Sequence, residues 1–202
     1  MTGLAALLGL VALTQPLWSF HRDSLSGDVD RDAWGWTAVT SEEWRNGVWA
    51  STTVVPYSSP TFRDFAMREA IGNAYAVGLL YFLLLAGMAG LLYYAKYAKS
   101  GRISTSVLRF ANLVVLGFGG LALAYPAMTI GSAASINLDP TVRGFAGSAQ
   151  VAGELWSWGP ATAWWLWGLS VFLTFVVFVV PFLQHRPRTM PTVPNPNYGR
   201  AR

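Results

Sequence analysis

Four long apolar segments interrupt an otherwise polar chain, and they constrain the fold more than any other feature of the sequence. A helix needs about 20 apolar residues to cross the hydrocarbon core of a bilayer, and the last three segments exceed that length. We therefore expect an all-α membrane fold, a four-transmembrane-helix bundle with a small β-containing extracytoplasmic loop domain. The helices of this transmembrane domain, residues 1–183, are predicted at about residues 3–20, 70–94, 105–130 and 161–183.

The composition favours burial in lipid. Of the 202 residues, 53% are hydrophobic and only 12% are charged, whereas soluble domains carry about 25% charged residues. The ten tryptophans fit a membrane protein, because indole rings favour the membrane–water interface. The absence of cysteine excludes disulfides, cysteine-ligated zinc, iron–sulfur clusters and thiol catalysis. Basic residues are not interleaved with aromatic residues on a soluble face, so we expect no nucleic-acid partner.

The first apolar segment has the length of a signal peptide, but no basic residue precedes it. We therefore expect it to form a first transmembrane helix. Residues 21–69 then form a long polar loop, and residues 47–57 are rich in the β-branched and aromatic residues typical of a strand. Residues 19–22 and 34–39 are candidate partner strands, whereas the Asp, Ser and Gly of residues 23–32 indicate turns.

The distribution of charge predicts the orientation in the membrane. Basic residues flank the turn near residues 95–104 and occupy the proline-rich tail, residues 184–202, whereas the 21–69 loop holds five arginines against eight acidic residues. The positive-inside rule therefore places both termini and the 95–104 turn in the cytoplasm. The expected localisation is a multi-pass protein of the cell membrane, with residues 21–69 and 131–159 outside and the lipid bilayer as its first partner.

The ionisable residues indicate no catalytic or metal site. The two histidines, His21 and His185, lie at opposite ends of the predicted bundle, so a bilayer of about 30 Å separates them. They cannot share one metal ion or one haem. No nucleophile elbow, phosphate loop or metalloprotease signature is present. We therefore predict no cofactor, no metal and no enzymatic activity.

Two asparagines, Asn73 and Asn112, are the polar exceptions inside the predicted helices. Hydrogen bonding between helices is the expected role of both, although a path for an uncharged solute stays open. Small residues in the same helices allow close helix packing, either within the bundle or against the helix of a partner. The small residues that we single out are Ala86, Gly90, Gly117, Gly120 and Ala124.

The order of segments resembles that of the claudin-like tetraspan proteins. Within the outer loop, Trp44-Arg45-Asn46-Gly47-Val48-Trp49 resembles the tryptophan–glycine–leucine–tryptophan motif of that family, with Val48 in the place of leucine. Residues 62–68 resemble the segment that leads into the second helix of the family. The paired cysteines that follow the motif in the family are absent here. The resemblance implies a small outer sheet on a left-handed four-helix bundle that acts by lateral contact.

These observations predict a non-catalytic membrane protein that acts by protein–protein contact, as a subunit of a larger membrane complex or as a homo-oligomer. Its partners are then other integral membrane proteins or copies of itself. Two alternatives stay open: an accessory subunit of a respiratory, oxidase or photosynthetic complex that binds lipid, quinone or pigment, and a channel or transporter for a neutral solute. The candidate contact residues of the outer loop are Trp34, Trp36, Trp44, Gly47 and Trp49.

Overall fold

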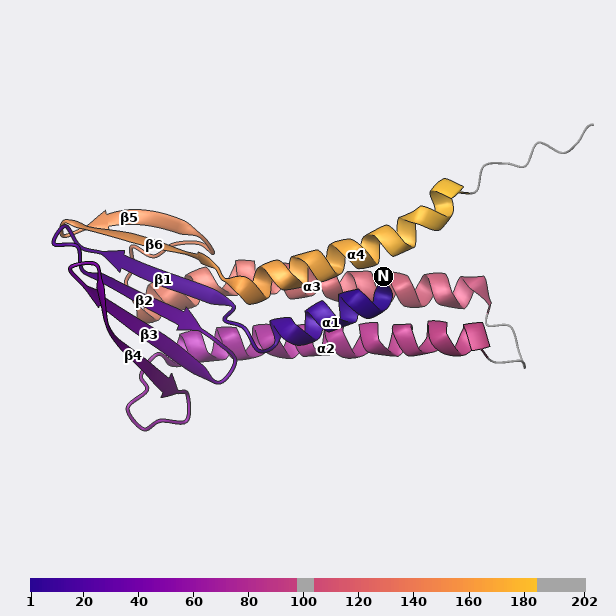
Figure 1. The fold of residues 1–202 in the computed structure, drawn as a ribbon, viewed down its shortest axis with the longest axis horizontal. Helices are drawn as coiled ribbons and strands as arrows, with labels where there is room; N and C mark the ends of the chain where they lie inside the picture. The colour runs from indigo at the N-terminus through magenta and orange to yellow at the C-terminus, as the bar shows by residue number, and fades with distance from the viewer. Residues whose placement is uncertain (98–103, 185–202) are drawn as a thin grey trace, which may run out of the picture.

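The computed structural model describes residues 1–97 and 104–184, and within them it contains four helices and six strands (Figure 1). The chain runs from a short helix into four strands, through two long helices and two further strands, and into a last helix. The elements are α1 (Thr2–Ala12), β1 (Trp18–Asp23), β2 (Val29–Trp34), β3 (Ala38–Arg45), β4 (Val48–Pro56), α2 (Phe65–Tyr97), α3 (Thr105–Asn137), β5 (Gly147–Val151), β6 (Glu154–Pro160) and α4 (Thr162–Gln184).

The prediction of four transmembrane helices is wrong. Among the described residues, only three helices are long and apolar enough to cross a membrane, and they span Phe65–Ala95, Ser106–Asn137 and Thr162–Val179. The first helix, α1, has 11 residues, and at 1.5 Å per residue it is about 16 Å long. That length covers about half of a bilayer core of roughly 30 Å.

The sequence after Ala12 explains why α1 is short. The Thr14 hydroxyl donates to the Val11 carbonyl over 2.8 Å, which closes the last turn. Pro16 follows, and a proline disfavours the helical conformation of the residue before it. The apolar residues that come next, Leu17 to Phe20, are buried mainly in the core under the sheet. Apolar character alone does not separate burial in lipid from burial under a sheet, and the prediction of a helix over residues 3–20 failed for that reason.

The six strands form one antiparallel sheet in the order β4-β3-β2-β1-β6-β5. The predicted strands at residues 19–22 and 47–57 correspond to β1 and β4. The predicted strand at residues 34–39 is only partly correct, because Trp34 ends β2, residues 35–37 form the turn, and residues 38–39 begin β3. The β-region is also larger than expected, since the second loop, residues 131–159, contributes β5 and β6.

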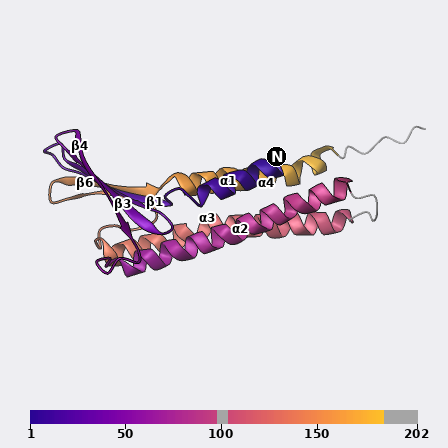
Figure 2. The same cartoon turned by 60° about the horizontal axis from the view of Figure 1, so that its bottom comes forward.

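The helices lie in two layers. Figure 2 shows α1 beside α4 in one layer and α2 beside α3 in the other. The first layer continues the sheet directly, because α1 leads into β1 and β6 leads into α4. Backbone hydrogen bonds cross the junction, from Ala161 N to Leu17 O over 2.9 Å and from Ala163 N to Pro16 O over 2.9 Å.

The main core lies where one face of the sheet meets the ends of α2 and α3. Trp18, Trp34 and Trp158 supply the largest side chains from the sheet. The Asn137 side chain at the end of α3 accepts a hydrogen bond from Met67 N in the first turn of α2, over 2.8 Å. This bond satisfies one of the free N–H groups that every helix start presents. The sheet therefore packs against one end of the helix layers, where α2 and α3 are hydrogen-bonded to each other.

Candidate interaction surface

The β3–β4 hairpin contains the motif on which the claudin-like resemblance rests. Asn46 and Gly47 have positive φ angles of 51° and 76°, the geometry of the two-residue turn that connects twisted antiparallel strands. Trp44 and Trp49 are cross-strand partners on either side of this turn. Gly47 therefore provides the backbone conformation that the turn requires. The pairing of β3 with β4 places the two tryptophans opposite each other.

Strand β4 is the most exposed apolar part of the sheet. Val48, Trp49 and Val54 are 68%, 55% and 58% exposed. The Trp49 indole donates to the Thr52 hydroxyl over 3.2 Å, which holds the ring along the strand. Nine consecutive residues of β4 carry no charge. Exposed apolar side chains on an uncharged strand are typical of a surface that a partner covers.

The other predicted tryptophans have different surroundings. Trp34 is only 1% exposed and packs against Tyr57 and Phe62, with ring centroids 6.3 and 6.2 Å away. Trp44 lies under the guanidinium of Arg31, whose central carbon is 5.8 Å from the ring centroid. Trp34 therefore builds the core, whereas Trp44 and Trp49 lie together on the hairpin.

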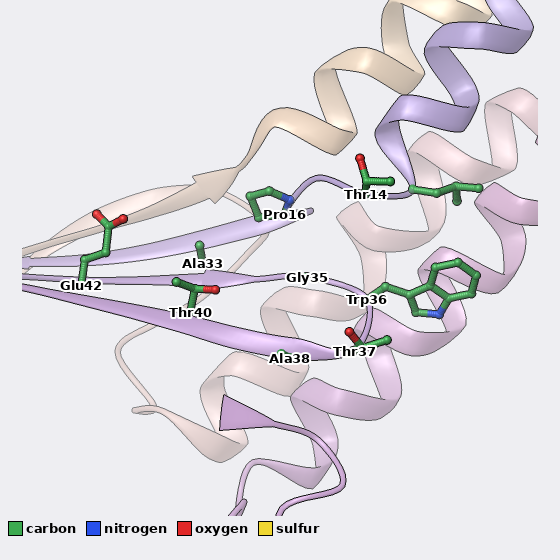
Figure 3. Close-up of a pocket in the computed structure, with 10 residues that line it drawn as sticks. Thr14, Pro16, Ala33, Gly35, Trp36, Thr37, Ala38, Thr40 and Glu42 are labelled. Carbon is green, nitrogen blue, oxygen red and sulfur yellow. The ribbon is translucent and has the colours of Figure 1, made fainter. Parts of the chain in front are cut away.

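Trp36 lies in the turn between β2 and β3, away from the hairpin. It is 40% exposed, and one face of its ring stacks on Tyr75 of α2, with centroids 5.7 Å apart and planes inclined by 8°. The ring lines a trough of about 540 Å³ on the face of β2 and β3 that points away from the core. Figure 3 shows Trp36 at the helix end of this trough and Glu42 at the opposite end. Thr14, Thr37 and Thr40 lie along it, over a floor of Ala33, Gly35 and Ala38.

Charged residues cross the same face of the sheet in a row. His21, Arg31 and Glu42 are successive register partners on β1, β2 and β3. Burial and the neighbouring Arg31 charge lower the pKa of His21, and nearby carboxylates of Asp23, Asp32 and Glu42 oppose this shift. The lowered pKa therefore favours the neutral form of His21. No salt bridge joins Glu42 to another residue in the part of the chain that the structure describes.

The predicted small-residue positions divide into open and enclosed sites. Gly90, Gly117, Gly120 and Ala124 are exposed on α2 and α3, and nothing lies within 4 Å of a side chain added at the three glycines. Ala86 is half-buried. These glycines therefore do not mediate contacts inside this chain.

Sequence reasoning missed the glycines that do pack inside. A side chain at Gly78 would collide with the Trp167 ring, and one at Gly119 would approach Val171 at 2.8 Å. Neither position is among the small residues singled out from the sequence. Trp167 in α4 was the feature of the sequence that could have pointed to Gly78, because a large buried ring needs a small residue opposite it.

A buried hydroxyl network links three helices and was also missed. Ser170 Oγ donates to the Ala5 carbonyl over 2.8 Å and lies 2.9 Å from Tyr81 Oη. Thr174 Oγ1 lies 3.3 Å from the same Tyr81 oxygen. The polar residues that we predicted instead occupy other places, since Asn73 is exposed on α2 and Asn112 is buried on α3.

The described residues contain no group of three or more His, Cys, Asp or Glu side chains that could hold a metal ion. His185 and the proline-rich tail lie outside the described residues, as do Lys99 and Arg102. The chain matches no protein-family model and shows no significant similarity to a curated protein. The claudin-like assignment therefore stays a prediction.

Proposed function

We propose that this protein is a non-catalytic membrane protein whose outer sheet binds other membrane proteins, either copies of itself or subunits of a larger complex. The observation that carries the proposal is β4, an uncharged edge strand that exposes Val48, Trp49 and Val54. Interfaces gain most of their energy from a few large side chains that bury fully, and tryptophan is enriched among them. Trp49 is the expected anchor of the contact, with Trp44 beside it.

We infer that the sheet lies on the outer side of the membrane. The end of α2 and the start of α3 lie at the opposite end of the helices from the sheet, and basic residues surround this connection in the sequence. The positive-inside rule assigns such a turn to the cytoplasm. The position of the C-terminus in the cytoplasm, after the third spanning helix, follows from the same argument.

The mass of the purified protein in mild detergent tests this proposal. One chain has a mass of 22.0 kDa, and light scattering coupled to size-exclusion chromatography gives the polypeptide mass of the assembly. We expect a larger mass for the wild type and about 22.0 kDa for a Trp49→Ser, Val54→Ser variant. Leu121→Ser, an exposed lipid-facing change on α3, is the matched control and keeps the wild-type mass. A wild type that is monomeric both in detergent and in its own membrane contradicts the proposal.

A second candidate function is the binding of a lipid in the trough beside Trp36. The observation that favours it is the gradient along the trough, from Leu13 and Trp36 at the helix end to Glu42 at the far end. A phospholipid with an ammonium headgroup has the same gradient, since its acyl chains are apolar and its ammonium group is a cation that a carboxylate attracts. Native mass spectrometry with phosphatidylethanolamine tests the idea. We expect one retained lipid in the wild type and loss of it in Glu42→Gln, and equal retention by both contradicts the idea.

A further inference from the structure

The two edge strands of the sheet lack the charges that edge strands normally carry. Within the six strands described, β4 and β5 contain no ionisable residue, whereas β1, β2, β3 and β6 each contain at least one. Exposed edges usually carry charged side chains, because these prevent pairing with another chain. Here the protection by charge is absent at both edges, although β4 has a bulge and ends in a proline and β5 has only 5 residues. The missing charges favour pairing of both edges with another strand.

The outward backbone groups of both edges are available for pairing. Each edge strand has one neighbour, β3 for β4 and β6 for β5. Tyr57 N donates to Thr37 O, and since bonded and non-bonded pairs alternate along an antiparallel ladder, the N–H and C=O groups of Thr52 and Val54 point away from β3. The two-residue turn at Ala152 and Gly153 places Ser148 and Gln150 in the same situation on β5. No described residue forms a backbone bond with these four positions on the open side.

The directions of the two edges match for copies in one membrane. Strand β1 runs away from the helices, and the strands alternate in direction across the sheet. Strand β4 therefore runs toward the helices, and β5 runs away from them (Figure 1). When a second copy is placed alongside in the same orientation, its β4 faces the first copy's β5 as an antiparallel partner. A twofold axis normal to the membrane would instead bring two β4 strands together in parallel, which is the less stable arrangement.

The helices leave room for this arrangement. Six strands at about 4.8 Å each give a repeat of roughly 29 Å per copy. Each helix layer is two helices wide, and two helices of about 10 Å occupy roughly 20 Å. Neighbouring sheets can therefore join while the helices of neighbouring copies stay separate.

We propose that the protein assembles head to tail with copies of itself in the same membrane, with β4 of one copy adding to β5 of the next. The proposal rests on the proposed function, because it assumes that the outer sheet is the contact surface, and it names the partner as a second copy of this chain. The interface is heterologous, so it leaves β4 free at one end of a dimer and β5 free at the other. Such interfaces give rows or closed rings.

Disulfide cross-linking in the intact membrane tests the proposal, since the chain contains no cysteine of its own. Thr53 and Ala149 bond inward to their own sheets, so across the new interface they belong to non-bonded pairs with Cα atoms about 4.5 Å apart. That separation lies within the range of disulfides. Both side chains also lie on the core-facing side of the sheet, in the rows of Phe20 and Arg22.

Two differently tagged single-cysteine chains, Thr53→Cys and Ala149→Cys, are co-expressed and oxidised. We expect a mixed disulfide dimer, and a ladder of dimers, trimers and larger species when one chain carries both changes. Ser51→Cys or Val55→Cys replaces Thr53→Cys in two further pairings with Ala149→Cys. These pairings test an interface in which β4 is shifted by two residues in either direction. Thr52→Cys with Ala149→Cys is the matched control, because Thr52 points to the opposite face, and we expect no cross-link.

A second variant keeps the test independent of cysteine geometry. Val54→Pro removes an outward N–H without removing a bond to β3, which edge positions tolerate. We expect it to lower the cross-linking yield about tenfold, because loss of one intermolecular bond and its neighbouring contacts is worth roughly 1.4 kcal/mol. Absence of cross-links in all registers, or a dimer of Thr53→Cys with itself as the main product, overturns the proposal. If the assembly mass stays above one chain in that case, only the head-to-tail arrangement fails, and the proposed contact function stands.

Discussion

The ring of Trp167 lies directly against the backbone of Gly78, so that α4 and α2 touch where one residue has no side chain. Trp167 is fully buried and also contacts Tyr75 edge to face, with centroids 5.6 Å apart. Tyr75 in turn donates to the carbonyl of Gln15, in the link between α1 and β1. This aromatic contact and this hydrogen bond thereby couple α4, α2 and the link that follows α1.

We predict that Gly78→Ala destabilises the protein by about 1–3 kcal/mol, because the added methyl group overpacks a filled site. Gly90→Ala is the matched control, since nothing lies within 4 Å of that position, and alanine favours a helix over glycine by up to about 1 kcal/mol. Thermal unfolding in detergent, followed by tryptophan fluorescence, measures both. Equal stability of the two variants would show that Trp167 does not occupy this site.

The Ser170 hydroxyl gives a second prediction. Ser170→Ala removes the bond to the Ala5 carbonyl and the contact with Tyr81 Oη. Bonds of this kind between membrane helices contribute about 0.6 kcal/mol on average, with a maximum near 1.7 kcal/mol. We expect a loss in that range, and a Tyr81→Phe variant that is less than additive with Ser170→Ala. Full additivity in this double-mutant cycle would contradict the shared network.

His21 gives a prediction about pH. Because its pKa is lower in the folded protein than its ordinary value of 6.5, the unfolded chain binds the proton first as the pH falls. Stability is therefore constant above the ordinary pKa, decreases below it, and levels off below the lowered pKa of the folded state. Unfolding midpoints measured from about pH 8 to about pH 5 should show this decrease, and His21→Gln should reduce it. If the unfolding midpoint of His21→Gln depends on pH as that of the wild type does, groups other than His21 cause the decrease in stability.

The hairpin turn gives a fourth prediction. Gly47 has a φ of 76°, and an alanine in a left-handed conformation costs about 1 kcal/mol or more. We expect Gly47→Ala to destabilise the outer sheet although no atom lies within 4 Å of the new methyl group. Asn46→Gly is the control, because a Gly-Gly pair suits the same turn. Hydrogen exchange of the β3 and β4 amides measures the local effect.

The three long helices could be predicted from the sequence because each consists of a continuous apolar run. The predicted ranges 70–94, 105–130 and 161–183 lie within or close to the observed Phe65–Tyr97, Thr105–Asn137 and Thr162–Gln184. The start of α2 agrees with the helical character expected of residues 62–69, whereas the last helical turns of α3, residues 131–137, were missed because most of these residues are small or polar.

The sheet was harder to predict, because its pairing is not local. Strand β1 pairs with β6, and residues such as Phe20 and Trp158 are far apart in the sequence. The β5–β6 hairpin has Ala152 and Gly153 in its turn, and this pair lacks the Asn-Gly signal that marks the β3–β4 turn. The alternation of Trp156 and Trp158 with Ser157 and Gly159 was the available signal for a strand.

The contact surface could be predicted only in part. Trp49 and Trp44 lie on the exposed hairpin, but Trp34 is in the core, and tryptophan content alone does not distinguish these cases. The absence of charge in β4 and β5 was visible in the sequence. The absence of charge indicates a contact surface only because β4 and β5 are the two edge strands of the sheet. Their position at the edges is visible only in the strand order.

Native mass spectrometry of the protein released from its own membrane shows whether the sheet holds other chains. We expect assemblies that contain more than one polypeptide, and single chains when β4 carries Trp49→Ser and Val54→Ser. Wild-type protein present only as a single 22.0 kDa chain, with the same result for the variant, would contradict the claim that the outer sheet is a contact surface.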